Sequence, residues 1–71
     1  MTVWVTRCDG EHIAQGVYLS IEEAARAVAA RYKGHRNEDE MNYVAIFEAF
    51  NNNSFRYFQP GGWWLEKHWM A

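Results

Sequence analysis

The sequence has very little cysteine and proline and shows no excess of basic residues. Cys8 is the one cysteine among 71 residues, so no internal disulfide can form, and a lone thiol fits a reducing cytoplasm better than a secreted scaffold. The three histidines, His12, His35 and His68, show no familiar zinc spacing with Cys8. We therefore expect a cytoplasmic protein that binds no metal and no cofactor.

The charge balance and the hydropathy pattern argue against two further classes of function. Seven lysines and arginines stand against nine aspartates and glutamates, whereas phosphate binding favours a basic face, so direct nucleic-acid binding is disfavoured. The N-terminus lacks a basic region followed by an apolar run, and we expect no signal peptide. The best helical segment, residues 20–33, is too short and too polar to cross a bilayer, so no membrane partner is expected.

No arrangement of residues predicts catalysis. Cys8 and His12 flank Asp9-Gly10, a strong signal for a tight two-residue hairpin turn. A hairpin tip offers neither a pocket nor oxyanion donors, and in that register Cys8 faces Glu11 instead of His12. We therefore predict that the protein is not an enzyme.

Residues 20–33 form the clearest predicted helix. Ser20 and Glu23 make a capping box, in which the serine oxygen accepts from a first-turn amide and the glutamate reaches back to the serine amide. Gly34 can adopt the left-handed conformation that ends a helix. Apolar residues recur with the spacing of one helical face: Ile21, Ala24, Ala25, Val28, Ala29 and Tyr32.

The remaining segments are rich in β-branched and aromatic residues. They predict strands over residues 2–8, 12–18, 55–59 and 63–70, with a turn at residues 60–62 before the last strand. In the first hairpin a tight turn places Thr6 opposite Ile13, unless Gly16 marks a bulge that shifts the register. The pattern does not fix which face of this hairpin meets the helix.

Residues 41–50 fit two structures. As a strand, alternate residues from Tyr43 to Ala49 line one face, and the turn-forming residues 51–54 connect it to the next strand as a hairpin. As a helix, Asn37 caps it and residues 38–40 fill its first turn. Its stripe would then consist of Tyr43, Ile46, Phe47 and Phe50. The hairpin argument favours the strand.

These elements predict one domain of the α+β class over residues 1–71. The expected fold is a small antiparallel sheet with one helix packed on one face, in the order ββαβββ. In the alternative, residues 37–50 are a second helix and the order is ββααββ. A chain of this length builds one small core.

The sequence is rich in aromatic residues, with four tryptophans, four tyrosines and four phenylalanines. One sheet and one alanine-rich helix cannot easily bury all these rings, so we expect some of them to face a partner. The candidate partner-binding residues are rings and cationic side chains of the C-terminal half, Arg56, Tyr57, Trp63, Trp64 and Lys67, and an acidic run, Glu38, Asp39 and Glu40. The plainer alternatives are that the rings form the core and that the acidic run is a solvated loop.

A very short, slightly acidic, cysteine-poor and aromatic-rich α+β domain without catalytic residues resembles the small accessory proteins of bacteriophages. Among these it is most similar in style to anti-CRISPR proteins, which block host interference complexes by stoichiometric binding. The resemblance covers the whole chain, but it rests on size, composition and layout and assigns no residues. It implies an inhibitor in the host-cell cytoplasm that docks on a nucleoprotein effector, with residues 38–40 covering a DNA-binding surface.

The sequence therefore predicts a non-enzymatic protein-binding module, and the resemblance implies a stoichiometric phage-type inhibitor of a bacterial, CRISPR-like nucleoprotein complex. Its expected partner is a host protein or nucleoprotein complex. One alternative is single-stranded nucleic-acid binding, with bases stacked on Trp63 and Trp64. The other is a self-associating structural subunit, in which the spare aromatic residues close a homodimer.

Overall fold

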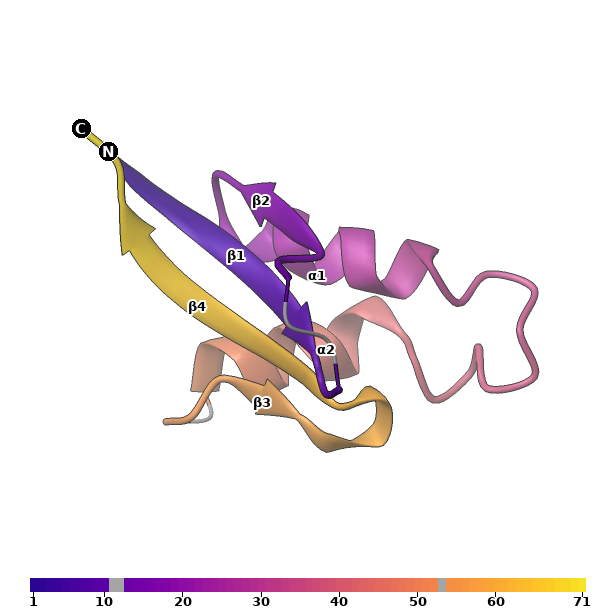
Figure 1. Ribbon diagram of the computed structural model, residues 1–71. Helices are drawn as coiled ribbons and strands as arrows, with labels where there is room; N and C mark the ends of the chain where they lie inside the picture. Colours follow the sequence, from indigo (N-terminus) through magenta and orange to yellow (C-terminus); the bar gives the residue numbers. More distant parts are fainter. Residues whose placement is uncertain (11–12, 53) are drawn as a thin grey trace.

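The computed structural model describes residues 1–10, 13–52 and 54–71 (Figure 1). Its elements are β1 (Thr2–Cys8), β2 (Gly16–Tyr18), α1 (Ile21–Ala30), α2 (Tyr43–Asn52), β3 (Tyr57–Phe58) and β4 (Trp63–Trp69), with a 3₁₀ turn, Gln59–Gly61, between the last two strands. The α+β class is as predicted. The predicted order ββαβββ with a single helix is wrong, and the two-helix alternative ββααββ matches the structure.

The four strands form one antiparallel sheet in the order β2-β1-β4-β3. β1 and β4 pair from Thr2 with Trp69 to Cys8 with Trp63, and they form the long central ribbon that carries both chain ends in Figure 1. The outer strands are short, since β2 pairs with residues 4–6 of β1 and β3 pairs with residues 63–64 of β4. Side chains alternate along each strand, so the sheet has one face against the helices and one open face.

α1 begins as the sequence predicts and ends earlier. The Ser20 hydroxyl accepts from the amide of Glu23 at 3.1 Å, and the Glu23 carboxylate accepts from the amide of Leu19 at 3.0 Å, one residue before the predicted serine amide. The regular helix stops at Ala30, because the next three amides bond three residues back in tighter turns. Gly34 then has a positive φ of 84°, as expected for the end of this helical segment.

The strand predicted at residues 41–50 is wrong, because this segment forms α2. The cap is Asn42 and not Asn37: the Asn42 side chain accepts from the amide of Ala45 at 3.0 Å, and its carbonyl accepts from the amide of Ile46 at 3.1 Å. Residues 38–40 therefore lie in turns before the helix and do not form its first turn.

Burial decides between helix and strand in this segment. Ile46 and Phe50 are fully buried, while Tyr43 and Phe47, four residues apart, stack with ring centroids 5.7 Å apart. The β-forming character of the run is thus outweighed by the apolar side chains that a helix places against α1 and the sheet. The predicted stripe of the helical alternative agrees with this arrangement.

The first hairpin has a longer loop than predicted. Thr6 pairs with Gly16 and not with Ile13, and β2 covers residues 16–18 instead of 12–18. A Cβ atom on Gly16 would collide with the ring of Tyr18 as it is placed, so the glycine leaves room for this ring. The predicted pairing of Cys8 with Glu11, and any role of His12, lie outside the described residues.

The C-terminal elements follow the prediction in part. β4 confirms the last predicted strand, and the predicted turn at residues 60–62 is present, with Gly62 in the left-handed conformation at a φ of 66°. The strand predicted at residues 55–59 is reduced to Tyr57–Phe58.

The core lies between the two helices and the sheet. Its buried members are Ala24, Ala25, Val28, Met41, Ile46, Phe50, Phe58, Trp63 and Leu65. Small alanines on α1 let α2 approach closely, so both helices pack on the same face of the sheet (Figure 1). Among the described residues, no helix has the length and apolar character needed to cross a membrane.

Candidate functional site

Trp63 and Trp64 are neighbours in the sequence but lie on opposite faces of the sheet. Trp63 is only 2% exposed, and its indole N–H donates to the hydroxyl of Tyr32 at 2.8 Å. The guanidinium of Arg31 lies 5.2 Å from the centre of the Trp63 ring. The structure thus places this candidate partner-binding residue in the core.

Trp64 lies on the face of the sheet opposite the helices, which we call the open face, and it is 38% exposed. It pairs with Tyr57 on β3, and the two ring centroids are 4.2 Å apart with an interplanar angle of 34°. Such aromatic pairs contribute about 0.5–1.5 kcal/mol beyond the burial of their area. Two of the candidate residues therefore form one aromatic surface.

Asp9, at the end of β1, holds both rings in place. Its Oδ1 accepts from the indole N–H of Trp64 at 2.6 Å, and its Oδ2 accepts from the hydroxyl of Tyr57 at 2.8 Å. The bond from Trp64, followed by the bond from Tyr57, lowers the pKa of Asp9 below its ordinary value of 3.8. In turn, the hydrogen bond to Asp9 raises the pKa of Tyr57 above 10. The rings are therefore oriented in the free protein by an ionised carboxylate.

The backbone brings Asp9 to this position. Its amide donates to the carbonyl of Gly62 at 2.7 Å, which continues the pairing of β1 and β4 past Trp63. Gly62 has a positive φ, and a Cβ atom there would come within 2.8 Å of the Asp9 carboxylate. A glycine at this turn thus leaves room for the side chain that orients Trp64 and Tyr57.

A second group of polar residues lies beside the aromatic pair. Glu66 accepts from Arg7 at 2.9 Å and lies 3.0 Å from the imidazole of His68. The hydrogen bonds from His68 and then from Arg7 lower the pKa of Glu66. Since these side chains are partly exposed, the pairs add little to stability, but they fix the orientation of Glu66 on the open face.

The open face also carries valines. Val3 and Val5 pair with His68 and Glu66, and both are buried, whereas Val17, opposite Val5, is exposed. Neither α1 nor α2 packs on this face (Figure 1). The open face therefore carries an aromatic pair at its β3 edge, together with two carboxylates and one guanidinium.

Two other candidate residues lie on the side of the sheet that faces the helices. The guanidinium of Arg56 donates to the carbonyl of Phe50 at 2.9 Å, near the end of α2, and lies 4.9 Å from the ring centre of Trp4. The ammonium of Lys67 is 5.9 Å from the same ring. Arg56 has a positive φ of 50°, and its contact with α2 indicates a structural role. The structure does not bring Arg56 and Lys67 together with Trp64.

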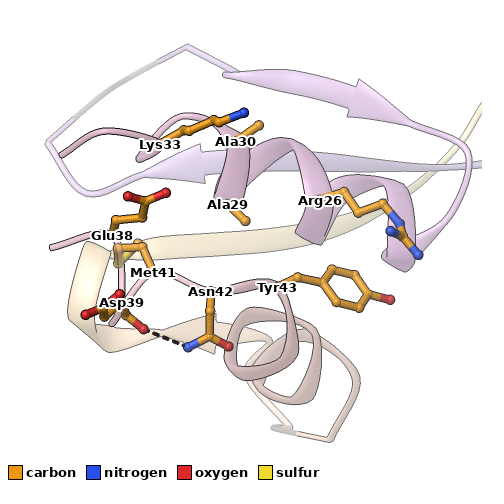
Figure 2. Close-up of a pocket in the computed structure, with 9 residues that line it drawn as sticks. All are labelled: Arg26, Ala29, Ala30, Lys33, Glu38, Asp39, Met41, Asn42 and Tyr43. Atoms are coloured by element: carbon orange, nitrogen blue, oxygen red, sulfur yellow. Dashed lines mark hydrogen bonds between the residues drawn. The ribbon is translucent and has the colours of Figure 1, made fainter.

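The acidic run lies elsewhere, at a groove of about 780 Å³ between α1, the connecting loop and the start of α2 (Figure 2). Glu38 and Asp39 line this groove, together with Arg26 and Lys33 on its other side. Glu40 is exposed but does not line it. The groove is therefore mixed in charge, because two cationic side chains offset the two carboxylates.

The sequence analysis missed Asp9 as part of a site. The Asp9-Gly10 pair was interpreted as a turn signal alone, and an aspartate at a turn carries no sign that its carboxylate meets rings from the other end of the chain. The nearest signal in the sequence was the alternation of side chains along β4, which places Trp63 and Trp64 on opposite faces of the strand. Across residues 1–10, 13–52 and 54–71, no group of three His, Cys, Asp or Glu residues is arranged to hold a metal ion.

Comparison of the chain with protein-family models, with curated proteins and with solved structures finds no significant match.

Proposed function

We propose that the protein is a non-catalytic protein-binding module whose docking surface is the open face, centred on the Tyr57–Trp64 pair. The supporting observation is a tilted pair of aromatic rings in close contact, which Asp9 holds by two hydrogen bonds and which neither helix covers. Tryptophan and tyrosine are the side chains that most often dominate protein–protein binding energy. Because the rings are already oriented, little side-chain entropy is lost when a partner binds.

The charges around the pair favour a partner that presents an arginine or lysine side chain. The face of an indole attracts a cation, and the carboxylate of Asp9, which has no ion-pair partner among the described residues, lies beside Trp64 and Tyr57, whereas Glu66 is paired with Arg7. The Asp9 carboxylate repels a phosphate backbone, which weakens the alternative of base stacking on Trp64. Trp63 is buried and cannot take part in such stacking without unfolding of the core.

The second part of the proposal names the class of target. The resemblance to anti-CRISPR proteins suggests a stoichiometric inhibitor of a bacterial nucleoprotein effector, and such effectors carry many basic side chains for their nucleic acid. In this version the open face covers a basic surface of the effector. The run at residues 38–40 is the weaker candidate for that role, because Arg26 and Lys33 share its groove.

The test is affinity capture with the wild-type protein and the variants Trp64→Ala and Val44→Ala. Val44 is an exposed residue of α2, away from the open face, and serves as the matched control. Lysates are used with and without nuclease treatment, and some of them contain CRISPR effector complexes. We expect a stoichiometric protein partner with the wild type and with Val44→Ala. Loss of a hot-spot tryptophan costs about 2 kcal/mol or more, roughly a thirty-fold weaker dissociation constant for Trp64→Ala.

Two results would contradict the proposal. One is a partner that binds Trp64→Ala as tightly as the wild type, provided that circular dichroism shows the variant to be folded. The other is recovery of nucleic acid alone, with every protein lost on nuclease treatment, which would favour the stacking alternative. If the captured partner is not a CRISPR effector, the proposed target is wrong, and the proposed docking surface still stands.

A further inference from the structure

Among the residues that the structure describes, the outer edge of β4 pairs with another strand only over the first half of its length. β1 pairs with β4 along its entire length, but β3 pairs only with Trp63 and Trp64, and the amide of Leu65 then donates to the carbonyl of Arg56 at 2.9 Å. No strand among the described residues pairs with this side of β4 from Lys67 to Trp69. An exposed edge of this kind is a template for another strand.

The direction of the backbone groups follows from bonds at the two ends of the edge. The Leu65 amide points outward, toward Arg56, while the Met70 amide points inward and donates to the carbonyl of Met1 at 2.8 Å. Because these directions alternate along a strand, the N–H and C=O groups of Lys67 and Trp69 point outward. The backbone groups of the alternate residues, Glu66 and His68, point toward their partners on β1 instead.

We propose that this edge pairs with the same edge of a second copy of the chain, antiparallel and centred on His68. In this register Lys67 lies opposite the partner's Trp69, and the pair occurs twice because of the two-fold axis. All the outward backbone groups of both residues are then hydrogen-bonded across the interface. The two His68 residues face each other at the axis as a pair without backbone hydrogen bonds between them.

Neighbouring registers fit less well. Centring on Lys67 sets two ammonium groups opposite each other and matches Trp69 with Leu65, whose amide is already bonded to Arg56. Centring on Trp69 places Lys67 opposite residue 71, which lies beyond β4. In the register centred on His68, only Ala71, which lies beyond the end of β4, is opposite Leu65 of the other copy. The charges and the free backbone groups of Lys67 and Trp69 therefore select this register.

The side chains support the same pairing. Trp69 is 75% exposed and lies on the same face of β4 as Lys67, whose ammonium is near the ring of Trp4. In the dimer each Lys67 lies between Trp4 of its own chain and Trp69 of the other, so a cation meets two rings. A two-fold axis perpendicular to the sheet also places the open faces of both copies on one side. The dimer does not depend on the proposed docking surface.

The first test is the mass in solution, measured by sedimentation velocity over a range of micromolar to submillimolar concentrations. We expect the wild type to form a dimer of twice 8.4 kDa at the high end. Trp69→Pro removes one outward amide while sparing the bonds to β1, and an edge position tolerates proline, so this variant should be folded and dimerise at least tenfold more weakly. Lys67→Glu keeps the backbone intact, removes the cation between the rings, and should weaken the dimer as well.

The register is tested by cross-linking in a Cys8→Ser background. His68→Cys places two thiols directly opposite each other at the axis, within the separation that a disulfide needs, whereas Lys67→Cys faces Trp69 of the other copy. Rapid oxidation of the first variant to a covalent dimer and slow oxidation of the second are expected. A wild type that stays monomeric throughout, equal oxidation of the two variants, or a dimer weakened by Trp64→Ala and not by the β4 edge variants would overturn the proposal.

Discussion

Trp63 and Trp64 allow the two faces of the sheet to be compared at adjacent positions. Each indole N–H donates one hydrogen bond, to Tyr32 on the face against the helices and to Asp9 on the open face. Trp63 is buried in the core, while Trp64 packs against Tyr57 and remains partly exposed. The comparison shows that similar hydrogen bonding can serve packing on one face and orientation of a surface on the other.

The largest difference between the faces is expected in stability. Trp63→Ala removes a ring from the core and leaves a cavity, which should lower the free energy of unfolding by about 3–5 kcal/mol, enough to unfold a domain this small. Trp64→Ala removes a partly exposed ring and should lower it by about 1 kcal/mol. Urea denaturation followed by circular dichroism compares the two variants, and a Trp63→Ala protein that is unfolded without urea counts as the larger loss. Equal losses would mean that the two faces do not differ as described.

A smaller effect is expected when the hydrogen bond of the covered tryptophan is removed. Tyr32→Phe keeps the packing of the ring but leaves the Trp63 indole N–H without its acceptor, which should cost about 1 kcal/mol. Thermal denaturation of Tyr32→Phe beside Tyr18→Phe, another partly buried tyrosine, measures the loss that is specific to this bond. An unchanged unfolding free energy in Tyr32→Phe would show that Trp63 is held by packing alone.

The smallest effect concerns pH at the open face. The pKa of Asp9 is lowered in the folded protein, so its stabilising contribution is complete above its ordinary value of 3.8 and is lost as pH falls through the lower folded value. The chemical shift of the Trp64 indole N–H should therefore change with a midpoint below 3.8. In Asp9→Asn this transition should be absent. A midpoint at or above the ordinary value would contradict the two hydrogen bonds to Asp9.

Local signals in the sequence predicted much of the fold. The Ser20 cap, the apolar face of α1 and the strands at both ends of the chain depend on nearby residues, and the structure confirms them. Tertiary packing determines the secondary structure of residues 41–50, because burial of Ile46 and Phe50 against α1 and the sheet outweighs the local preference for a strand.

The candidate site was predictable only in part. Alternation along β4 places Trp63 and Trp64 on opposite sides of the strand, but it does not show which tryptophan points toward the helices. The contact of Asp9 with Tyr57 and Trp64 joins residues about fifty positions apart and depends on the register of β1 with β4. Arg56 was grouped with Trp64 by proximity in the sequence, whereas its hydrogen bond to Phe50 ties it to the end of α2.

The most direct test of the open face uses the four tryptophan indole N–H resonances as reporters in a titration with the captured partner protein. Trp64 reports on the open face, Trp63 on the core, Trp4 on the cluster with Arg56, and Trp69 on the edge of β4. The proposed function predicts that Trp64 shifts or broadens most on binding, while Trp63 stays unchanged. If the Trp64 resonance is unperturbed when the protein is saturated with its partner, the proposed function is contradicted. The groove between α1 and α2 then becomes the next candidate site.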